Sequence, residues 1–262
     1  MPRIRRRPRR PETTLADPIY SDRLVDLYPC EALRFLDSLP DESIDLVLTD
    51  APYSSGGLTR SDRHASPRAK YVQTGTRRPH PNFSGDGRDG RGWLHWCTLW
   101  ITQCHRVLRP HGYILMFTDW RQLPTATDAL QAGGLIWRGL IVWDKTDCAR
   151  APHKGYYRHQ AEYVVWGTKG VSKPATHGGP WRGVYRYPVR QRDKHHMTGK
   201  PTPLCRDLVQ CVPAGAVVLD PLAGSGTTLI AAALECRQAI GCEYDPVIAE
   251  GAVDRLRREL AG

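Results

Sequence analysis

Val217-Val-Leu-Asp220-Pro-Leu-Ala-Gly224-Ser-Gly226-Thr-Thr228 is the stretch of sequence that decides the fold. The apolar residues 216–219 predict a short buried strand, and the apolar run from 227 to 236 predicts a helix. The two glycines between them let the chain turn tightly and let a ligand approach the backbone. The first turn of the helix also presents N–H groups that have no partner within the helix. This pattern predicts a ligand site between strand and helix, and the alternative is a tight turn with no ligand.

The residues around this turn narrow the kind of ligand. A further strand is expected at 238–242, and Glu243 closes it 23 positions after Asp220. An acid at about this spacing receives ribose hydroxyls in dinucleotide-binding folds. The signatures of a pyrophosphate site are incomplete, because no Lys-Ser/Thr pair follows the glycines and Leu229 stands where a third glycine is expected. The expected ligand has a ribose but no pyrophosphate.

A second strand end carries a different set of side chains. Ser43-Ile-Asp-Leu-Val-Leu48 predicts a buried strand, and Asp50-Ala51-Pro52-Tyr53 follows it. Asp50 can accept a hydrogen bond from an amino group, the backbone carbonyl of Ala51 or Pro52 can accept another, and Tyr53 offers a face for a planar ring. In the alternative reading, Asp50 caps a turn and Tyr53 packs in the core. Open α/β sheets bind ligands at the carboxyl ends of their strands, so we expect both strand ends to form pockets.

The rest of the chain indicates an α/β fold. About seven strands alternate with helices, which predicts a doubly wound, mostly parallel sheet. The strands expected at 139–143 and 161–166 form an antiparallel hairpin at its edge. The tryptophans are interpreted as packing residues of the core and helices rather than as stacking platforms. They are Trp93, Trp96, Trp100, Trp120, Trp137 and Trp143.

The charge of the chain predicts a polyanionic partner. The 262 residues carry a formal net charge of +10 with a pI near 9.4, which favours nucleic acid. Residues 1–10 contain six arginines and no acid, so 1–20 is predicted to be a basic disordered arm that contacts DNA or only aids solubility. Residues 54–92 contain eight Lys or Arg against three Asp. We interpret them as a mobile, DNA-contacting loop beside Tyr53.

The cysteines and the apolar runs exclude several classes of protein. The eight cysteines include no Cys-x-x-Cys pair and no zinc-type spacing with histidine, so no metal site is expected. There is no signal-peptide pattern and no apolar run of transmembrane length. We expect a soluble, cytoplasmic protein with no membrane partner.

The two strand-end motifs together resemble those of a known enzyme family. Val-Leu-Thr-Asp50-Ala-Pro-Tyr53 with Val-Leu-Asp220-Pro-Leu-Ala-Gly-Ser-Gly is similar to the S-adenosylmethionine-dependent amino-methyltransferases of DNA, the adenine-N6/cytosine-N4 family. The catalytic tetrapeptide precedes the cofactor turn, as in the circularly permuted beta class. Segments 39–45, 196–201 and 241–243 resemble that class as well. The resemblance implies a Rossmann-like methyltransferase fold, with 21–262 as a single methyltransferase domain.

The resemblance also implies roles for individual residues. Asp50, Pro52 and Tyr53 would be catalytic, and S-adenosylmethionine would be the cofactor. Lys200 and Pro201 would close over the cofactor. The cofactor would be lined by Asp220, Ala223, Gly224, Gly226, Thr227, Glu243 and Tyr244. This chain departs from the family pattern at Ala51, where a proline is usual; the carbonyl survives that change.

The expected reaction is direct in-line attack of adenine N6 in double-stranded DNA on the cofactor's methyl group, because Asp at the first position of the tetrapeptide favours adenine in this family. Cytosine-N4 transfer is the alternative, with RNA or a protein glutamine as further acceptors. A DNA-binding protein on a catalytically retired scaffold is an alternative of another class. Residues 167–196 are predicted to be a short target-recognition segment. The resemblance allows a homodimer and a cognate restriction nuclease as partners, and the sequence decides neither.

Overall fold

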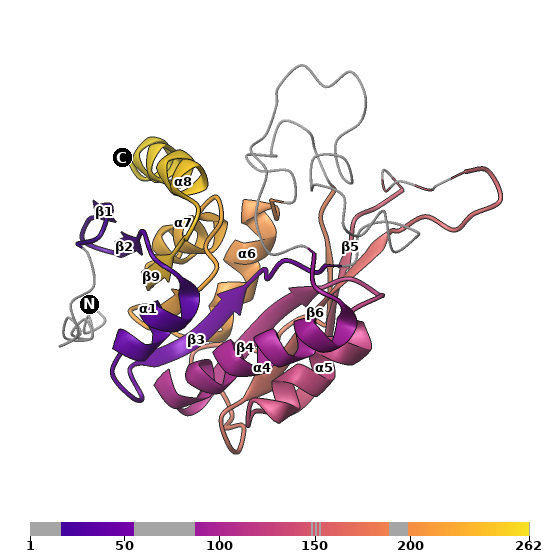
Figure 1. The fold of residues 1–262 in the computed structure, drawn as a ribbon, viewed down its shortest axis with the longest axis horizontal. Coiled ribbons are helices and arrows are strands. Elements are labelled where there is room, and N and C mark those ends of the chain that lie inside the picture. Colours follow the sequence, from indigo (N-terminus) through magenta and orange to yellow (C-terminus); the bar gives the residue numbers. More distant parts are fainter. Residues whose placement is uncertain are drawn as a thin grey trace.

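The computed structural model describes residues 17–54, 87–147, 149, 151, 153–188 and 199–261. In this part of the chain the strands form one sheet in the order β1-β2-β9-β8-β3-β4-β6-β5-β7 (Figure 1). The strands are β1 Tyr20–Ser21, β2 Val25–Tyr28, β3 Ile44–Thr49, β4 Leu108–Thr118, β5 Ile136–Asp144, β6 Ala161–Thr168, β7 Val184–Arg186, β8 Val217–Asp220 and β9 Gln238–Cys242.

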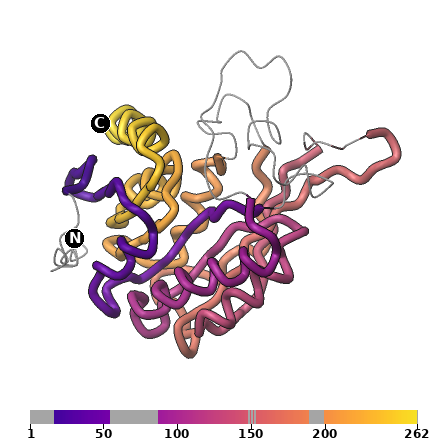
Figure 2. Tube along the Cα trace, in the orientation of Figure 1, coloured from indigo at the N-terminus to yellow at the C-terminus, as the bar shows by residue number. Residues whose placement is uncertain are grey.

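Helices cover both faces of the sheet (Figures 1 and 2). One face packs against α1, α4 and α5 in a core that includes Phe35, Trp100 and Leu130. The other packs against α6, α7 and α8 around Leu208, Leu229 and Leu256. The helices are α1 Ala32–Ser38, α4 Gly90–Val107, α5 Leu123–Ala132, α6 Thr202–Leu208, α7 Thr227–Leu234 and α8 Pro246–Leu260, with a 3-10 turn at Val209–Cys211.

The doubly wound, mostly parallel arrangement is confirmed. Strands β2, β9, β8, β3 and β4 pair in parallel, and β6 pairs antiparallel with both β4 and β5. The sheet of the described residues has nine strands where about seven were expected, because the short strands β1 and β7 were not foreseen. The β5–β6 hairpin was expected at the edge of the sheet. This was wrong, because β7 pairs in parallel with β5 and covers its outer side.

Strand β7 lies inside 167–196, the segment predicted to recognise the DNA target. Tyr185 at its centre is buried against the core. Tyr187 donates a hydrogen bond to Asp207 at 2.7 Å, and its carbonyl accepts one from the Trp143 indole at 2.8 Å. Residues 189–196 lie outside the described residues. Residues 184–186 of the segment are therefore built into the fold as the edge strand, whereas 170–183 are exposed and form no helix or strand, and the predicted role in target recognition stays a prediction.

Two other predicted segments fall largely outside the described residues. The basic arm was placed at 1–20, of which 17–20 are described, and β1 begins at Tyr20. The loop was placed at 54–92, of which 54 and 87–92 are described. Helix α4 begins within that range at Gly90, where Asp89 caps it by accepting a hydrogen bond from the Gly92 N–H at 2.7 Å. The DNA contacts predicted for both segments stay predictions.

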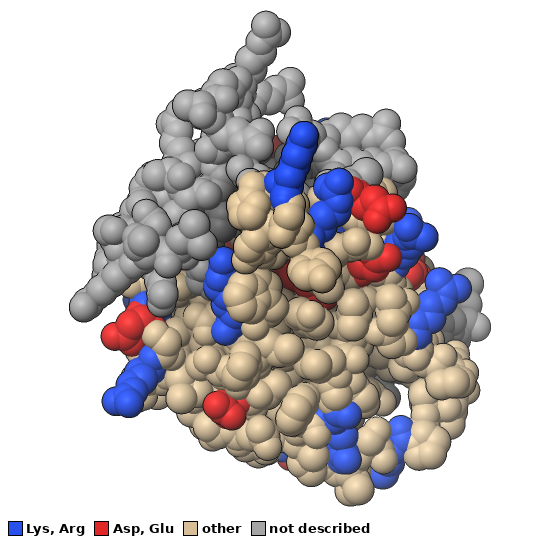
Figure 3. Space-filling view, turned by 90° about the vertical axis from the view of Figure 1, so that its right-hand side faces the viewer, with Lys and Arg blue, Asp and Glu red and all other residues tan. Residues whose placement is uncertain are grey.

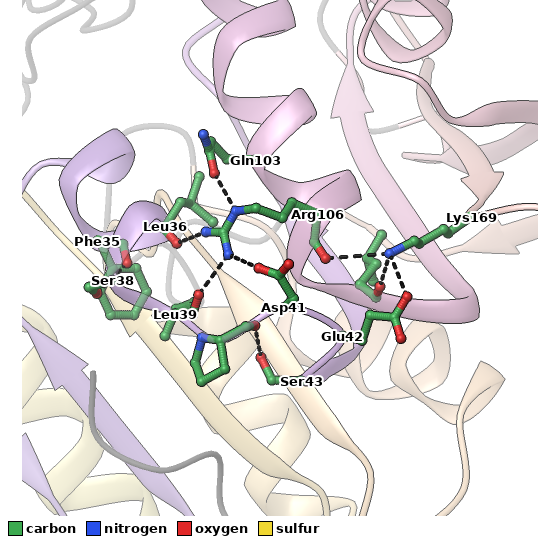
Figure 4. Close-up of polar contacts among 12 residues, drawn as sticks. Phe35, Leu36, Ser38, Leu39, Asp41, Glu42, Ser43, Gln103, Arg106 and Lys169 are labelled. Atoms are coloured by element: carbon green, nitrogen blue, oxygen red, sulfur yellow. Dashed lines mark hydrogen bonds and ion pairs between the residues drawn. The ribbon is translucent and has the colours of Figure 1, made fainter. Parts of the chain in front are cut away.

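A polar network lies at the end of the sheet at which β3 begins (Figure 4). Arg106 on α4 donates to the carbonyls of Leu36 and Leu39 at the end of α1. Lys169 donates to the carbonyl of Leu108 at 2.8 Å and lies 3.3 Å from the carboxylate of Glu42. These bonds join the turn between α1 and β3 to α4 and β4, at the end of the sheet opposite the carboxyl ends of β3 and β8.

Candidate active site

The two strand ends that the sequence singles out lie side by side. Strand β3 pairs in parallel with β8, with Val47 opposite Leu219. Beyond this pair, the Thr49 hydroxyl donates a hydrogen bond to Asp220 Oδ1 at 2.8 Å. The tetrapeptide that begins at Asp50 and the glycine turn after Asp220 therefore share one edge of the sheet, as predicted.

A buried lysine joins the tetrapeptide to another strand. Lys200 Nζ lies 2.8 Å from Asp50 Oδ2 and 2.9 Å from Glu162 Oε1, and the Lys200 side chain is 6% exposed. Glu162 is the second residue of β6. The resemblance placed Lys200 over the cofactor. In the structure its ammonium group contacts the carboxylate predicted to be catalytic.

Tyr53 is held at both of its ends. Its hydroxyl donates to Glu162 Oε1 at 2.7 Å, and its carbonyl accepts from the Gln122 side-chain amide at 2.7 Å. Lys200 Nζ lies 5.1 Å from the centre of its ring, within range of a cation–π interaction. These contacts fix the plane of the ring, which a stacking residue requires.

The middle of the tetrapeptide packs against α4. The Pro52 carbonyl accepts a hydrogen bond from the indole of Trp93 at 2.7 Å, and Trp93 is fully buried. Ala51 is also buried, in the core cluster that contains Trp93. A small apolar side chain therefore fits the position at which the family usually has proline.

The charges of the tetrapeptide site balance one another. Burial opposes ionisation of Glu162, but the cations of Lys200 and Lys145 and the hydrogen bond from Tyr53 outweigh it and lower its pKa to about 2. Burial raises the pKa of Asp50, and the Lys200 charge opposes that rise. Burial and the two carboxylates raise the pKa of the Tyr53 phenol. At neutral pH, Tyr53 is therefore a hydrogen-bond donor and Glu162 is ionised.

The glycine turn forms the second half of the site. Gly224 and Gly226 have φ values of 50° and 76°, in the left-handed region that favours glycine. A Cβ atom added at Gly224 would meet nothing within 4 Å, so the space beside this residue is open. Gly226 is the N-cap of α7, which begins at Thr227, and Ala223 beside the turn is buried. The turn therefore has the open backbone and the helix start that were predicted.

Two acids border the turn. Glu243 accepts hydrogen bonds from the backbone N–H groups of Gly224 and Asp245, each at 2.9 Å. Asp220 is buried and accepts a bond from the Leu222 N–H at 3.1 Å. Burial raises the pKa of Asp220 to about 7, against the hydrogen bonds that it accepts. Tyr244, which follows Glu243, is 68% exposed.

Arg255 on α8 ties the turn to the segment that carries Lys200. It donates to the Thr227 hydroxyl at 2.7 Å and to the Thr202 hydroxyl at 2.8 Å. Thr202 begins α6, with Pro201 as its N-cap. In the sequence, Pro201 thus lies between Lys200 of the tetrapeptide site and Thr202, which Arg255 links to the glycine turn.

The sequence analysis missed Glu162, Gln122, Trp93 and Arg255 as residues of the site. Glu162 had a usable signal, because it is an acid at the start of an otherwise apolar strand. Strand β6 runs antiparallel to β4, so its first residues lie at the edge where the parallel strands end. Gln122 and Arg255 carry no such signal, since polar residues on helices are usually solvated.

The residues of the turn fit a cationic ligand with a ribose. Two acids, Asp220 and Glu243, border a turn whose backbone lies beside an open space at Gly224. Glu243 is held by two backbone N–H groups, so the orientation of its carboxylate is fixed. Among the described residues, no group of three or more His, Cys, Asp or Glu side chains is placed to hold a metal ion. No helix of that part of the chain is long and apolar enough to cross a membrane.

The fold and this site define a Rossmann-like methyltransferase. Residues 44–254 match the profile of the family described as DNA methylase, the N6/N4 group. The match covers most of the chain, and the chain therefore belongs to the N6/N4 DNA methylase family.

Individual relatives agree with this assignment. The type II methyltransferase M2.DpnII of Streptococcus pneumoniae is 25% identical over 264 residues, covering 94% of each chain. The structure of a DNA modification methylase from Thermus thermophilus, complexed with S-adenosyl-L-methionine, matches with a TM-score of 0.65 and 23% identity over 90% of this chain and 94% of that one. The PvuII DNA methyltransferase, described as cytosine-N4-specific, has the same fold, with a TM-score of 0.70 and 14% identity over 92% of this chain and 90% of that one.

Proposed function

We propose that this DNA methylase transfers a methyl group from S-adenosylmethionine to the exocyclic N6 of adenine in double-stranded DNA. The observation that carries the proposal is the Thr49–Asp220 hydrogen bond of 2.8 Å, which sets the tetrapeptide beside the glycine turn. A base held by Tyr53 would then lie next to a cofactor held at Gly224 and Glu243. When bound, S-adenosylmethionine supplies a methyl group on a sulfonium, activated for attack by the amino nitrogen.

The protein's task is to make a poor nucleophile attack. The lone pair of an exocyclic amine is delocalised into the ring, and two acceptors aimed at its protons favour a pyramidal nitrogen with a free lone pair. Asp50 supplies one acceptor. The Pro52 carbonyl already binds the Trp93 indole, which favours the Ala51 carbonyl as the other.

Lys200 and Glu162 support this arrangement through their contacts with Asp50 and Tyr53. Burial raises the pKa of Asp50, and the Lys200 ammonium 2.8 Å away opposes that rise by favouring the ionised carboxylate. As the nitrogen takes up the methyl group it becomes positive, and the Asp50 carboxylate stabilises that charge and can take the proton. Glu162 orients Lys200 and the Tyr53 hydroxyl together.

We propose adenine rather than cytosine as the target base, because Asp50 stands at the first position of the tetrapeptide. Cytosine-N4 transfer is the second candidate, because the N6/N4 family includes both reactions. A retired scaffold that only binds DNA is disfavoured, because a pure binder has no use for the Asp50–Lys200–Glu162 network.

The test is to incubate the protein with unmethylated genomic DNA and methyl-tritiated S-adenosylmethionine, with Asp50→Ala as the control. Mass spectrometry of the digested product then identifies the nucleoside. N6-methyl-2′-deoxyadenosine is the expected product, and N4-methyl-2′-deoxycytidine would assign the second candidate. Label transfer by neither protein would refute the enzymatic proposal.

A further inference from the structure

A group of aromatic side chains, together with one arginine, lies on the surface beside the Tyr53 site and has no role in the proposed chemistry. It consists of residues from the turn after β4 and from the connection between β5 and β6, and we name it the aromatic ridge. Its members are Trp120, Arg121, His153, Tyr156, Tyr157 and His159.

Four rings of the ridge form a continuous row of contacts, and Tyr157 projects beside them. The rings of Trp120 and His159 lie nearly parallel at 17°, with centroids 6.4 Å apart. Tyr156 meets His159 edge to face at 5.7 Å, and His153 meets Tyr156 at 5.4 Å. Arg121 lies over the Trp120 ring at 4.6 Å. The two segments therefore hold one another.

The stack nevertheless leaves large apolar surfaces in water. Trp120 is 48% exposed and Tyr156 is 44% exposed, and Tyr157 is 93% exposed. Trp120 was expected in the core, so this prediction was wrong. Aromatic side chains gathered in this way on a surface mark a site for a partner.

The ridge borders the Tyr53 site on two sides. Gln122, two residues after Trp120, donates to the Tyr53 carbonyl, and Glu162, three residues after His159, accepts from the Tyr53 hydroxyl. At the base of the β5–β6 connection, Lys145 Nζ lies 3.3 Å from Glu162. In Figure 1 this connection extends away from the body of the molecule, and Figure 3 shows Lys and Arg side chains on the side of the molecule from which it extends.

The chemistry of the ridge fits nucleic acid. Its flat faces can stack on bases, and Arg121 with Lys154 and Arg158 can neutralise phosphates. Asp119 precedes Trp120 in the sequence and is the acid closest to the ridge along the chain. Its carboxylate accepts hydrogen bonds from the backbone N–H groups of Arg121 and Gln122. A duplex from which one base has been flipped also exposes a gap that apolar side chains can fill.

We propose that the aromatic ridge contacts the DNA duplex directly beside the flipped base, with Tyr157 stacking on a base and the nearby cations on phosphates. This inference rests on the proposed function. It places a main DNA contact on the β5–β6 connection, in addition to the recognition segment that the sequence analysis predicted at 167–196.

The experiment measures binding of a fluorescein-labelled duplex that carries the site methylated by the wild-type protein, by anisotropy at fixed salt. Tyr157→Ala should weaken DNA binding about 10-fold, as loss of one stacked base does, and Trp120→Ala should act in the same direction. Melting temperature and affinity for S-adenosylmethionine should not change for Tyr157→Ala, because this side chain is 93% exposed.

The matched control is Trp137→Ala. Trp137 is 42% exposed on the same hairpin, near the start of β5 and far along the strand from Asp144, and this variant should bind DNA as the wild type does. A third variant, Lys154→Gln, should reduce the slope of log affinity against log salt by about 1.

Two outcomes separate this inference from the function on which it rests. An active wild type whose Tyr157→Ala and Trp120→Ala variants bind DNA as tightly as Trp137→Ala would overturn the ridge and leave the methyltransferase proposal intact. A wild type that transfers no label would overturn both.

Discussion

Lys200 and Asp50 are 150 residues apart in the chain, and their charged groups lie 2.8 Å apart in the site. The Lys200 side chain is buried, and Glu162 Oε1 also lies 2.9 Å from its ammonium nitrogen. Burial opposes the charge of Lys200, but the two carboxylates outweigh it and raise its pKa. A cation from the second half of the chain therefore favours the ionised form of Asp50 against the effect of burial, at the residue proposed to bind the substrate's amine.

Removing the Asp50 carboxylate should abolish most turnover and leave cofactor binding intact. Asp50→Ala is expected to lower kcat at least about 100-fold, the usual effect of losing a group that stabilises charge in the transition state. Asp50→Asn keeps the shape and one acceptor oxygen, so its turnover should fall between that of the wild type and that of Asp50→Ala. Tritium transfer measures turnover and calorimetry measures cofactor affinity. Wild-type activity in Asp50→Ala would remove this residue from the mechanism.

Glu162→Gln should slow the reaction because Lys200 and Tyr53 lose their common anchor. We expect kcat to fall at least about 10-fold, equivalent to about 1.4 kcal/mol of transition-state stabilisation, with a smaller change in KM. The matched control is Glu42→Gln, which removes a carboxylate 3.3 Å from Lys169 at the opposite end of the sheet. Equal kinetics for the two variants would show that Glu162 is only structural.

Cofactor binding should strengthen as pH rises from 6 to 8. Burial raises the pKa of Asp220 to about 7, so the carboxyl group is mostly protonated at pH 6 and mostly ionised at pH 8. The ionised form attracts a sulfonium cation, and the gain over these two units is about 10-fold. Calorimetry at both pH values tests this, and Asp220→Asn should remove the dependence. A flat wild-type profile would contradict the prediction.

The same shift has the opposite sign for stability in the absence of cofactor. The native state holds the Asp220 proton up to about pH 7, whereas the unfolded chain releases it near its ordinary value of 3.8. The contribution of this group to stability is therefore present at low pH and is lost as pH rises from about 4 through about 7. Melting curves of the wild type and Asp220→Asn across this range should diverge in favour of the variant at high pH.

The same substitution at two glycines should have opposite effects. A Cβ at Gly241 would lie 2.7 Å from the Asp220 carbonyl, so Gly241→Ala must force β8 and β9 apart and should cost about 1–3 kcal/mol. Gly251 lies in α8 with nothing within 4 Å of an added Cβ. Gly251→Ala should stabilise by about 0.5–1 kcal/mol. Chemical denaturation measures both, and destabilisation by Gly251→Ala would count against the packing described.

Strand and turn patterns were enough to predict the parallel sheet and its two strand-end sites. Glycines and acids that follow predicted strands indicate ligand sites in open α/β sheets. In such sheets the carboxyl ends of the parallel strands lie together at one end of the sheet. The acid at the start of β6 was a usable signal for Glu162, but placing it at the site also required the direction of β6 relative to β4, which the strand pattern alone does not give. Strand β7 was missed because three residues in a Gly- and Arg-rich segment carry no periodic signal.

The tryptophans show the same division between local pattern and tertiary context. Trp93, Trp100 and Trp143 are buried as expected, since they lie on the apolar sides of predicted elements. Trp120 and Trp137 are 48% and 42% exposed. A hydrophobic side chain in a turn or at a strand start has no periodicity to place it, and only the neighbouring segment determines its exposure.

The pairing of β3 with β8 has a consequence for the chain while it is being synthesised on the ribosome. Asp50 and Tyr53 are synthesised before Lys200, the glycine turn and Glu243. A nascent chain that has not reached Lys200 lacks the residue that pairs with Asp50, and it cannot yet bring the two strand ends together. By the proposed function, a product that stops before Lys200 is expected to have no methyltransferase activity.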